Sequence, residues 1–420
     1  MHAHAAVVIV SYILLFVIVA LCFAGCIAVG LYRGRVGGAC VGLVSVLVAT
    51  SWLFPAALWL ASNPLSPCSM HWLQSSRAHG SVNAQGEWEG IWCQRACADA
   101  QVIYAQHRAH IARVLIASGA RSIRVVGSGH SMEELQCPDR DGIVLVVADA
   151  LCDSEGMRIS SRPVDGETLA TLSAGCTVRE AQKFLLASGL QLKGFGAVLE
   201  QRIGGALATN LHGLHLEAFA SHLRGVEAVL ADGSTVVVGP DDPALRAWSG
   251  SVGSLGVVVT ATMRVWPIEY ATCTVEEVRG SAVDVALQSA LREGNLVGFS
   301  AEAVLGSKRH DDRAMQLRRC VSTADEVDTV EMPSFEDSVH WATIAGMEYW
   351  GMSALTLWST WWSSVVYRAI RMPYESTSGP TALLFLKPGN YNPHPDQEYA
   401  VPIERCVEAL QDFRVLARGV

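Results

Sequence analysis

Several short apolar runs of this sequence are followed at once by glycine-rich segments. Residues 127–131 are Gly-Ser-Gly-His-Ser and come directly after the largely apolar run 123–126. Residues 203–213 are Ile-Gly-Gly-Ala-Leu-Ala-Thr-Asn-Leu-His-Gly, and residues 253–258 are Gly-Ser-Leu-Gly-Val-Val. Glycine at this density next to strands indicates a backbone that closely approaches a large, flat ligand. We therefore expect short strands whose connecting loops bind such a ligand.

Two helices are predicted in the same part of the chain. Apolar residues recur near helical spacing between residues 98 and 117, and Gly119 follows as a helix stop; the apolar residues are Val102, Ile103, Ile111, Val114 and Leu115. Thr177 and Glu180 form a capping box that opens a second helix over 178–188, which Gly189 ends.

Strands are predicted between and after these helices. Their ranges are 123–126, 142–148, 168–174, 223–230, 234–238 and 257–266. Asp232 and Gly233 suit a tight hairpin turn between the strands 223–230 and 234–238. Strands interleaved with helices, together with a hairpin, indicate an α+β or mixed α/β fold.

Two uncharged runs near the N-terminus, 5–31 and 39–61, are each long enough to cross a bilayer as a helix. A cleaved signal peptide is the alternative for the first run, but no basic segment precedes it. Arg33 and Arg35 lie between the runs, and cationic loops stay cytosolic. We expect residues 1–62 to be a transmembrane helical hairpin. It would make the chain an integral protein of the endomembrane system, such as the endoplasmic reticulum, with membrane lipid as a partner and a lumenal globular region.

The remaining chain divides by composition into three parts. Residues 63–97 are rich in proline, serine and glycine and are expected to be an exposed linker. Residues 98–267 contain the glycine-rich segments. Residues 268–420 are polar as far as His340 and then tryptophan-rich over 349–367, which indicates a separate second domain.

Net charge and cysteine spacing argue against nucleic acid as a partner and against a zinc site. A net charge of −9 argues against nucleic acid, since phosphate binding requires clustered lysine and arginine. Nine of the twelve cysteines lie outside the uncharged runs and lack paired spacing, so no zinc site is expected. His212 and His215 could pair on a metal, but no third ligand has helpful spacing, and no metal is expected. Disulfides in a lumenal domain could form among Cys68, Cys93 and Cys97.

The segment 127–131 suits a bound pyrophosphate, because glycines let successive backbone amides turn towards an anion. Taken alone, it is a weak signal. It lacks the third glycine and opening helix of a dinucleotide-binding fingerprint, and no lysine makes it a Walker loop. His130 alone would most often be an ordinary structural histidine.

The order of these motifs along the chain is similar to that of a known family. Gly-Ser-Gly-His-Ser, the segment 203–213, Ala231-Asp232-Gly233 and the segment 253–258 precede a strand that ends in Trp266-Pro267. This order resembles the flavin domain of the vanillyl-alcohol-oxidase superfamily, and within it the aldonolactone oxidases and the related alditol oxidases. The resemblance covers residues 98–267 well and the later region weakly. It implies an α+β fold, with a two-subdomain FAD-binding domain of the PCMH type over 98–267 and an incomplete α+β substrate domain over 268–420.

The resemblance also implies the site. FAD would be the cofactor, bonded covalently to a ring nitrogen of His130, although other members keep the motif without the bond. His212 would either border the flavin or simply pack in the core. The implied cofactor-binding residues are Val126, Gly127, Ser128, Gly129, His130, Ser131, Ala197, Arg202, Gly205, Thr209, His212, Gly213 and Val258.

By this resemblance the chain would oxidise a sugar aldono-1,4-lactone of the D-arabinono- or L-gulono-lactone type, as in ascorbate biosynthesis, and pass electrons to oxygen or another acceptor. One alternative is a truncated, non-catalytic membrane protein that binds FAD. Another is a different flavin enzyme of the superfamily, such as a cytokinin dehydrogenase or a sterol reductase.

The C-terminal region departs from the family pattern. Residues 398–404, Glu-Tyr-Ala-Val-Pro-Ile-Glu, resemble the segment that precedes a Glu-x-Arg strand and a His-Trp-x-Lys tail, but the sequence reaches Val420 before either. We therefore expect a C-terminally truncated chain and assign no catalytic residue. The tryptophan-rich stretch 349–367 is expected to be a membrane-proximal surface helix, with a third membrane span as its alternative.

Overall fold

The structure is a computed structural model that describes most residues between 79 and 323 and a few after them. The described ranges are 79–91, 96–131, 133–147, 151–153, 156–196, 198–279, 282–292, 294–303, 314–323 and 377–384, with 405, 407–409 and 412. The expected membrane hairpin 1–62, the tryptophan-rich stretch 349–367 and the segment 398–404 lie outside these ranges. Within them, none of the helices has the length and apolar character that a membrane span needs.

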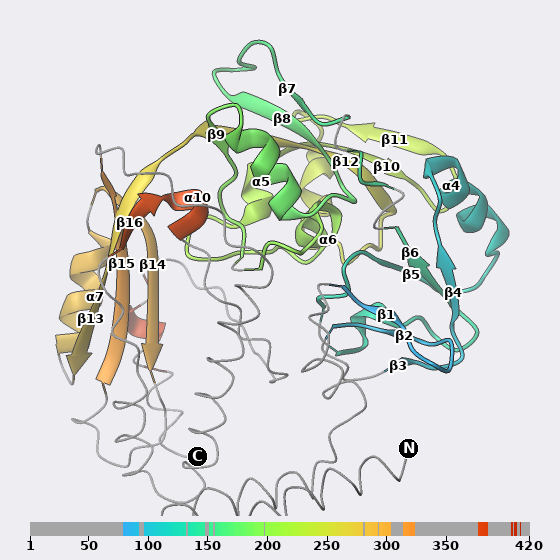
Figure 1. Ribbon diagram of the computed structural model, residues 1–420, viewed down its shortest axis with the longest axis horizontal. Coiled ribbons are helices and arrows are strands. Elements are labelled where there is room, and N and C mark those ends of the chain that lie inside the picture. The colour runs from blue at the N-terminus through green and yellow to red at the C-terminus, as the bar shows by residue number, and fades with distance from the viewer. Residues whose placement is uncertain are drawn as a thin grey trace, which may run out of the picture.

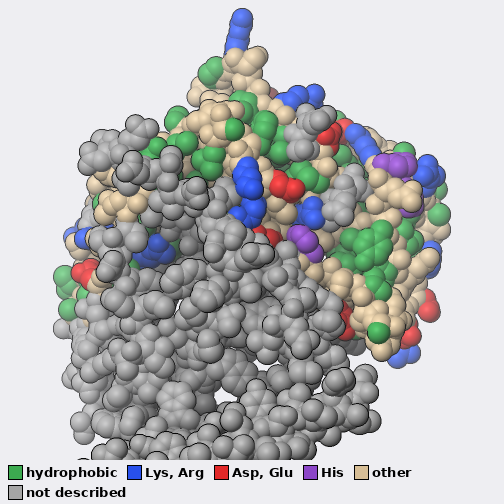
Figure 2. All heavy atoms as spheres, viewed as in Figure 1, with side chains coloured by type: hydrophobic (Ala, Val, Ile, Leu, Met, Phe, Trp, Pro, Cys, Tyr) green, Lys and Arg blue, Asp and Glu red, His purple; other side chains and the backbone are tan. Residues whose placement is uncertain are grey.

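The described strands form four sheets (Figure 1). In that view the four-stranded sheet stands at the left, the six-stranded sheet runs across the top, and two three-stranded sheets lie at the right. Charged side chains of both signs are interspersed over the visible face of the described residues (Figure 2).

The first small sheet is antiparallel and consists of β1 (Ser81–Val82), β2 (Trp88–Glu89) and β3 (Ala96–Cys97). Trp88 is only 1% exposed, and it packs with Cys97, Val126 and Val144 in one apolar cluster. The expectation of an exposed linker over 63–97 is therefore wrong for its described last third. Trp88 stands among glycines and polar residues and has no periodic signal, yet its burial orders the segment around it.

The second small sheet is parallel, with β6 (Ile143–Val146) between β4 (Gln101–Tyr104) and β5 (Ile123–Val126). The helix α4 (Arg108–Ala117) and the short 3-10 helix η1 (Glu133–Gln136) lie in its connections. The predicted helix is thus correct only from Arg108 onward. Val102 and Ile103 belong to β4, because pairing with β6 decides the structure of a short apolar run that periodicity alone leaves ambiguous.

The six-stranded sheet has the order β11-β10-β12-β8-β7, and β9 pairs with the end of β12. Its pairs are antiparallel, and Asp232-Gly233 turns between β10 and β11 with Gly233 at a φ of +80°. The strand predictions here are confirmed to within two residues. The strands are β7 (Arg158–Ile159), β8 (Thr168–Ser173), β9 (Leu190–Gln191), β10 (Leu223–Val229), β11 (Thr235–Val238) and β12 (Val257–Pro267).

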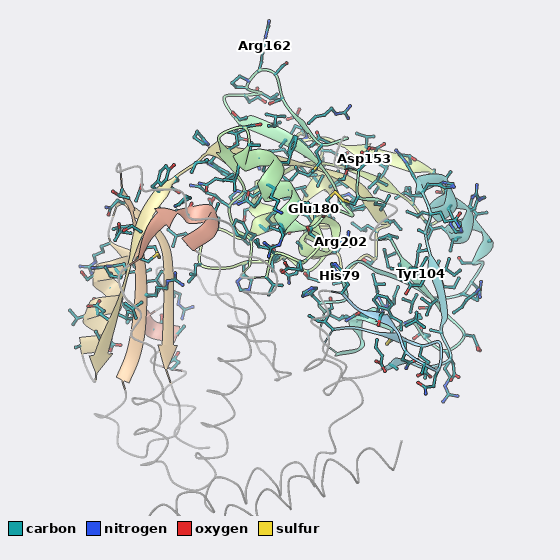
Figure 3. All side chains as sticks on the ribbon, in the orientation of Figure 1. His79, Tyr104, Asp153, Arg162, Glu180 and Arg202 are labelled. Atoms are coloured by element: carbon teal, nitrogen blue, oxygen red, sulfur yellow. A yellow bond between two sulfur atoms is a disulfide. The ribbon has the colours of Figure 1, made fainter. Side chains whose placement is uncertain are left out.

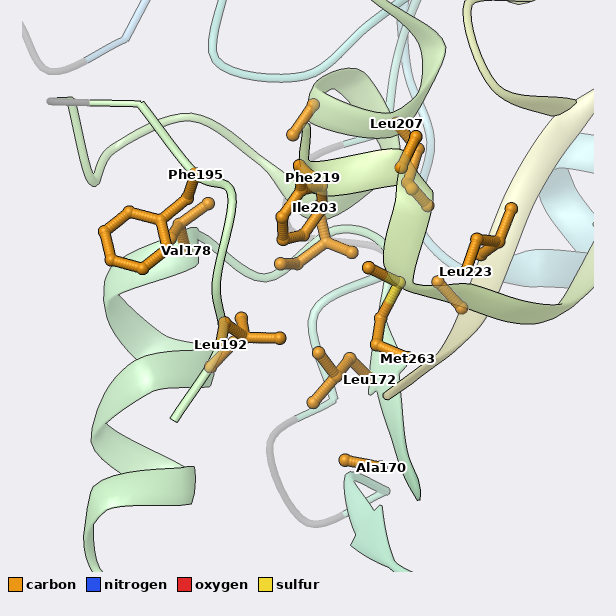
Figure 4. Close-up of a cluster of buried hydrophobic side chains, with 14 of the residues drawn as sticks. Ala170, Leu172, Val178, Leu192, Phe195, Ile203, Leu207, Phe219, Leu223 and Met263 are labelled. Carbon is orange, nitrogen blue, oxygen red and sulfur yellow. The ribbon is translucent and has the colours of Figure 1, made fainter. Parts of the chain in front are cut away.

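One face of this sheet is covered by α5 (Val178–Leu186) and α6 (Ile203–Ala208) (Figure 1). The predicted capping box is present: Thr177 Oγ1 accepts from the amide of Glu180 at 3.1 Å, and the Glu180 carboxylate accepts from the amide of Thr177 at 2.7 Å. Side chains from α5, α6, β8, β12 and the 3-10 helices η3 (Phe219–His222) and η4 (Pro243–Trp248) fill the core between them (Figure 4).

The four-stranded sheet begins directly after β12 and has the order β14-β15-β13-β16. The helix α7 (Ala282–Leu291) packs beside it, and α10 (Thr381–Leu384) follows its edge strand. The strands are β13 (Tyr270–Arg279), β14 (Leu296–Ala303), β15 (Ala314–Thr323) and β16 (Thr377–Pro380).

Three disulfides join described cysteines, namely Cys97–Cys137, Cys152–Cys176 and Cys273–Cys320. The suggested pairing of Cys97 with Cys68 or Cys93 is therefore wrong. The partner of Cys97 lies 40 residues later in the sequence, where β3 and the end of η1 come together in space. Sequence spacing contained no sign of that approach.

Candidate functional site

A cavity of about 310 Å³ opens between the small parallel sheet and the covered face of the six-stranded sheet. Its walls come from the loop after β5, the start and body of α6, and the segment before β12. Ten of the residues expected to bind a cofactor line it: Val126, Gly127, Ser128, Gly129, His130, Ser131, Arg202, Gly205, Thr209 and Val258. Three glycine-rich segments that are far apart in sequence thus meet at one cavity.

Two carbonyl groups of the loop 127–131 accept hydrogen bonds from the segment 80–91. The amide of Gly80 donates to the carbonyl of Ser128 at 2.8 Å, and the amide of Ile91 donates to the carbonyl of Gly129 at 3.0 Å. Gly129 has a φ of +72°, which reverses the direction of the backbone. No described residue accepts a hydrogen bond from the amides of Ser128 or Gly129. Successive amides of this kind form a nest suited to an anion.

The side chain of Ser128 is used within the protein. Its hydroxyl donates to the carbonyl of Glu200 at 2.6 Å and accepts from Nε of Arg202 at 3.2 Å. Ser128 is only 4% exposed. Any contact between Ser128 and a pyrophosphate would therefore be made by its backbone amide.

Arg202 joins three parts of the cavity wall. Besides Ser128, its guanidinium donates to the carbonyl of Gly175 at the end of β8, and its backbone forms a bridge with Thr177. A Cβ atom on Gly127 would lie 3.0 Å from Cγ of Arg202. Arg202 is buried near the middle of the described region (Figure 3). Its contacts with Ser128 and Gly175 hold two parts of the cavity wall together.

The opposite wall, formed by α6, leaves open space. A Cβ atom added to Gly205, which lines the cavity, would meet no described residue outside the helix backbone within 4 Å. Thr209 follows directly after α6, and its hydroxyl donates to the carbonyl of Gly205 at 3.0 Å. Among the described residues, none covers α6 at Gly205, so a ligand can contact the helix there.

The segment before β12 contains a strained residue at the cavity edge. Val252 has a φ of +51°, a conformation that β-branched residues rarely adopt. The amide of Val252 donates to the carbonyl of Ala208 at 2.9 Å, which ties this segment to α6. Strain of this kind gathers at ligand-binding segments.

Two expected residues, His212 and Gly213, are not on the cavity wall, and a third is not described. Ala197 lies outside the described residues. His212 is exposed, and neither it nor Gly213 lines the cavity. Gly213 is required for packing, since a Cβ there would lie 2.2 Å from the carbonyl oxygen of Phe195.

A cluster of buried histidines lies just beyond this segment. Burial, followed by the positive charges of Lys193 and His222, lowers the pKa of His215 to about 3. Burial also lowers the pKa of His222 to about 4, with Glu217 acting in the opposite direction. His215 forms a β-bridge to Gly298 on β14. The cluster therefore lies where the four-stranded sheet contacts the segment that follows α6.

Sequence reasoning missed part of the cavity wall. Gly253 and Gly256 belong to a quoted motif but were not assigned to the site, whereas Gln136 and Leu151 carried no signal. No catalytic residue is assigned among the residues that line the cavity.

Comparison with known families gives a match for the region that surrounds the cavity. The sequence profile of a family described as FAD binding domain matches residues 100–239. Among curated proteins, D-arabinono-1,4-lactone oxidase of Eremothecium gossypii is 31% identical over 193 residues, which are 43% of this chain and 34% of that protein.

Two further relatives are of comparable similarity. L-gulono-1,4-lactone dehydrogenase of Mycobacterium tuberculosis is 28% identical over 43% of this chain and 40% of its own length. Alditol oxidase of a Streptomyces species is 30% identical over 33% of this chain and 32% of its own length. The chain thus matches less than half the length of each of these relatives.

Among solved structures, cholesterol oxidase from Brevibacterium sterolicum superposes with a TM-score of 0.53 and 14% sequence identity. The alignment covers 70% of this chain and 60% of that one. At this identity the likeness concerns the fold alone.

Proposed function

Given that the chain carries an FAD-binding domain over residues 100–239, with FAD as its cofactor, we propose that it is an FAD-dependent oxidoreductase acting on a sugar aldono-1,4-lactone. Relatives named as lactone oxidase, lactone dehydrogenase and alditol oxidase support this class of reaction. They favour an enzyme over a non-catalytic flavin-binding protein. The electron acceptor would be oxygen or another oxidant.

The observation that carries the proposal is the fit between the cavity and FAD. The amides of Ser128 and Gly129 donate to no described residue, which leaves them available to a pyrophosphate. Gly205 leaves a flat, open face on α6, where a ring system or its ribityl chain can lie without meeting a Cβ. When bound, the flavin would supply the hydride-accepting chemistry that amino-acid side chains lack.

The protein's own part in this function is binding and orientation. Arg202 and Ser128 hold the loop after β5 against the end of β8, which keeps the amide nest in place. We propose that His130, on the same loop and lining the cavity, bonds covalently to the flavin. Such a bond would fix the ring and keep the cofactor in place during turnover.

We further propose that residues 1–62 anchor the chain in an endomembrane, with the globular region in the lumen. Their two uncharged runs and the intervening Arg33 and Arg35 support this topology. The disulfides in the globular region agree with an oxidising compartment. A glycosylation acceptor introduced after residue 100 should be modified, and an unmodified acceptor would place the domain on the cytosolic side.

Purification of the full chain tests the function. We expect a yellow protein with a flavin absorbance spectrum and with flavin fluorescence that persists on a denaturing gel. A His130→Ala variant should lose the fluorescence on the gel but still bind FAD. A His110→Ala variant, altered on α4 away from the cavity, should behave like the wild type.

Turnover is measured separately with aldonolactones, using oxygen or an artificial dye as the acceptor. Flavin reduction by an aldonolactone without oxygen would support the proposed reaction. A yellow protein whose flavin no aldonolactone or alditol reduces would reject the substrate class. A colourless protein that takes up no FAD would contradict the whole assignment.

A further inference from the structure

A buried glutamine of the cavity wall contacts the loop that carries His130. Gln136, the last residue of η1, is 8% exposed. Its side-chain nitrogen donates to the carbonyl of Gly129 at 3.3 Å and also to the carbonyl of Ser131. One amide group thus holds the two carbonyls on either side of His130.

The other end of this amide is fixed as well. The indole nitrogen of Trp88 donates to Oε1 of Gln136 at 2.9 Å, and Trp88 is fully buried. This bond orients the glutamine, because its oxygen must face Trp88 and its nitrogen must then face the loop. The amide therefore has all its strong donors and acceptors assigned.

Close packing leaves the glutamine little freedom. A Cβ atom on Gly90 would lie 2.4 Å from Nε2 of Gln136 and 2.9 Å from the carbonyl oxygen of Gly129. The next residue, Cys137, is bonded to Cys97, which pairs with Trp88 across β2 and β3. Gln136 is thus held both through its side chain and through its neighbour in the chain.

These contacts set the direction of the amide nest. Gln136 and the amides of Gly80 and Ile91 together bind the carbonyls of residues 128, 129 and 131. Because a peptide group is planar, the amide that follows each carbonyl points the opposite way. The amide of Gly129 therefore points away from the amide of Gly80, which binds the carbonyl of Ser128.

We propose that Gln136 is a positioning residue that holds the loop 127–131, and the His130 ring on it, in the conformation that receives FAD. The inference rests on the proposed role of this cavity as the flavin site. It also makes residues 79–91, which precede the matched FAD-binding region, part of the same site.

The test replaces Gln136 by methionine, which has a similar shape but carries no amide and buries no charge. We expect Gln136→Met to lower the affinity for FAD about tenfold, through the loss of hydrogen bonds to both carbonyls. The affinity is measured in a His130→Ala background, where the flavin remains exchangeable. With His130 intact, the fraction of flavin retained on a denaturing gel should fall and the visible circular dichroism of the bound flavin should change.

Gly90→Ala provides a second variant, because its methyl group would crowd both the Gln136 nitrogen and the Gly129 carbonyl oxygen and so disturb their hydrogen bond without removing a polar group. It should reproduce the flavin effects of Gln136→Met. Gly239→Ala, where a Cβ would meet nothing within 4 Å, is the matched control and should leave the flavin unchanged.

The outcomes separate this inference from the proposed function. A wild-type chain that binds no FAD defeats the proposed function itself. A wild-type chain that binds FAD, with Gln136→Met and Gly90→Ala variants of unchanged affinity and flavin spectrum, overturns the positioning role alone. Failure of both variants to fold would also overturn it, since Gln136 would then serve general stability.

Discussion

At the scale of single residues, glycine at position 205 is explained by the cavity and not by the stability of the fold. It lies in α6, where glycine is less favourable than alanine because it loses more conformational freedom on folding. A Cβ atom added there would meet no atom of the described residues within 4 Å outside the helix backbone. The fold itself therefore gives no reason for glycine at this position, and the cavity gives one.

A Gly205→Ala variant is expected to change stability and binding in opposite directions. The free energy of unfolding of the flavin-free protein should rise by about 0.5–1 kcal/mol, measured by urea denaturation. The affinity for FAD should fall at least about tenfold, because the methyl group enters space that the cofactor needs. A variant that binds FAD normally would show that the cofactor does not lie against this face of α6.

At the scale of elements, the N-terminus of α5 is fixed by the capping box at Thr177. Thr177 is buried and also forms a backbone bridge with Arg202, so this helix start touches the cavity wall. The box satisfies two backbone amides that the helix itself leaves without partners.

Thr177→Ala is expected to lower the free energy of unfolding by about 1 kcal/mol, because the Glu180 amide loses its hydroxyl acceptor. The measurement is the urea midpoint of the purified protein. Ser188→Ala, at the exposed opposite end of the helix, is the control and should change stability by less than about 0.5 kcal/mol. Equal effects of the two substitutions would mean that the box adds nothing beyond helix propensity.

At the scale of the whole molecule, His215 and His222 make stability depend on pH. Both have a folded pKa far below the ordinary value of 6.5, at about 3 and about 4, mainly because they are buried. The unfolded chain binds these protons near pH 6.5, whereas the folded chain does not. Their contribution is therefore complete above pH 6.5 and is lost as the pH falls towards 4.

The free energy of unfolding should fall between pH 6.5 and pH 4 by at most about 1.4 kcal/mol per pH unit for each histidine. His222 should contribute less, because Glu217 favours its protonated form. Urea titrations at pH 7 and pH 5 measure the difference, and His215→Gln should flatten it. Identical midpoints at the two pH values would contradict the depressed pKa values.

The sequence predicted the parts of the fold and site whose causes are local. The Thr177 capping box, the Asp232-Gly233 turn and the glycines of the loop after β5 depend on near neighbours, and the structure places them as expected. Ten of the thirteen expected cofactor-binding residues line one cavity, because the motifs of the resemblance keep their order along the chain.

The parts that sequence reasoning missed depend on contacts between distant segments. Trp88 and Gln136 are 48 residues apart, and neither has a periodic or motif signal of its own. Val102 and Ile103 had the spacing of a helix, but the partner strand β6 made them a strand. Cys97 is bonded to Cys137, which lies 40 residues later in the sequence.

Because β12 lies between β8 and β10, the six-stranded sheet stays incomplete until β12 has been synthesised. Thr171 on β8 and Thr262 on β12 contact each other but are 91 residues apart in sequence. A growing polypeptide leaves the ribosome N-terminus first, so β8 has an unpaired edge until β12 has been translated. Exposed strand edges invite association with other chains, and nascent chains of this protein are therefore expected to need chaperones during that interval.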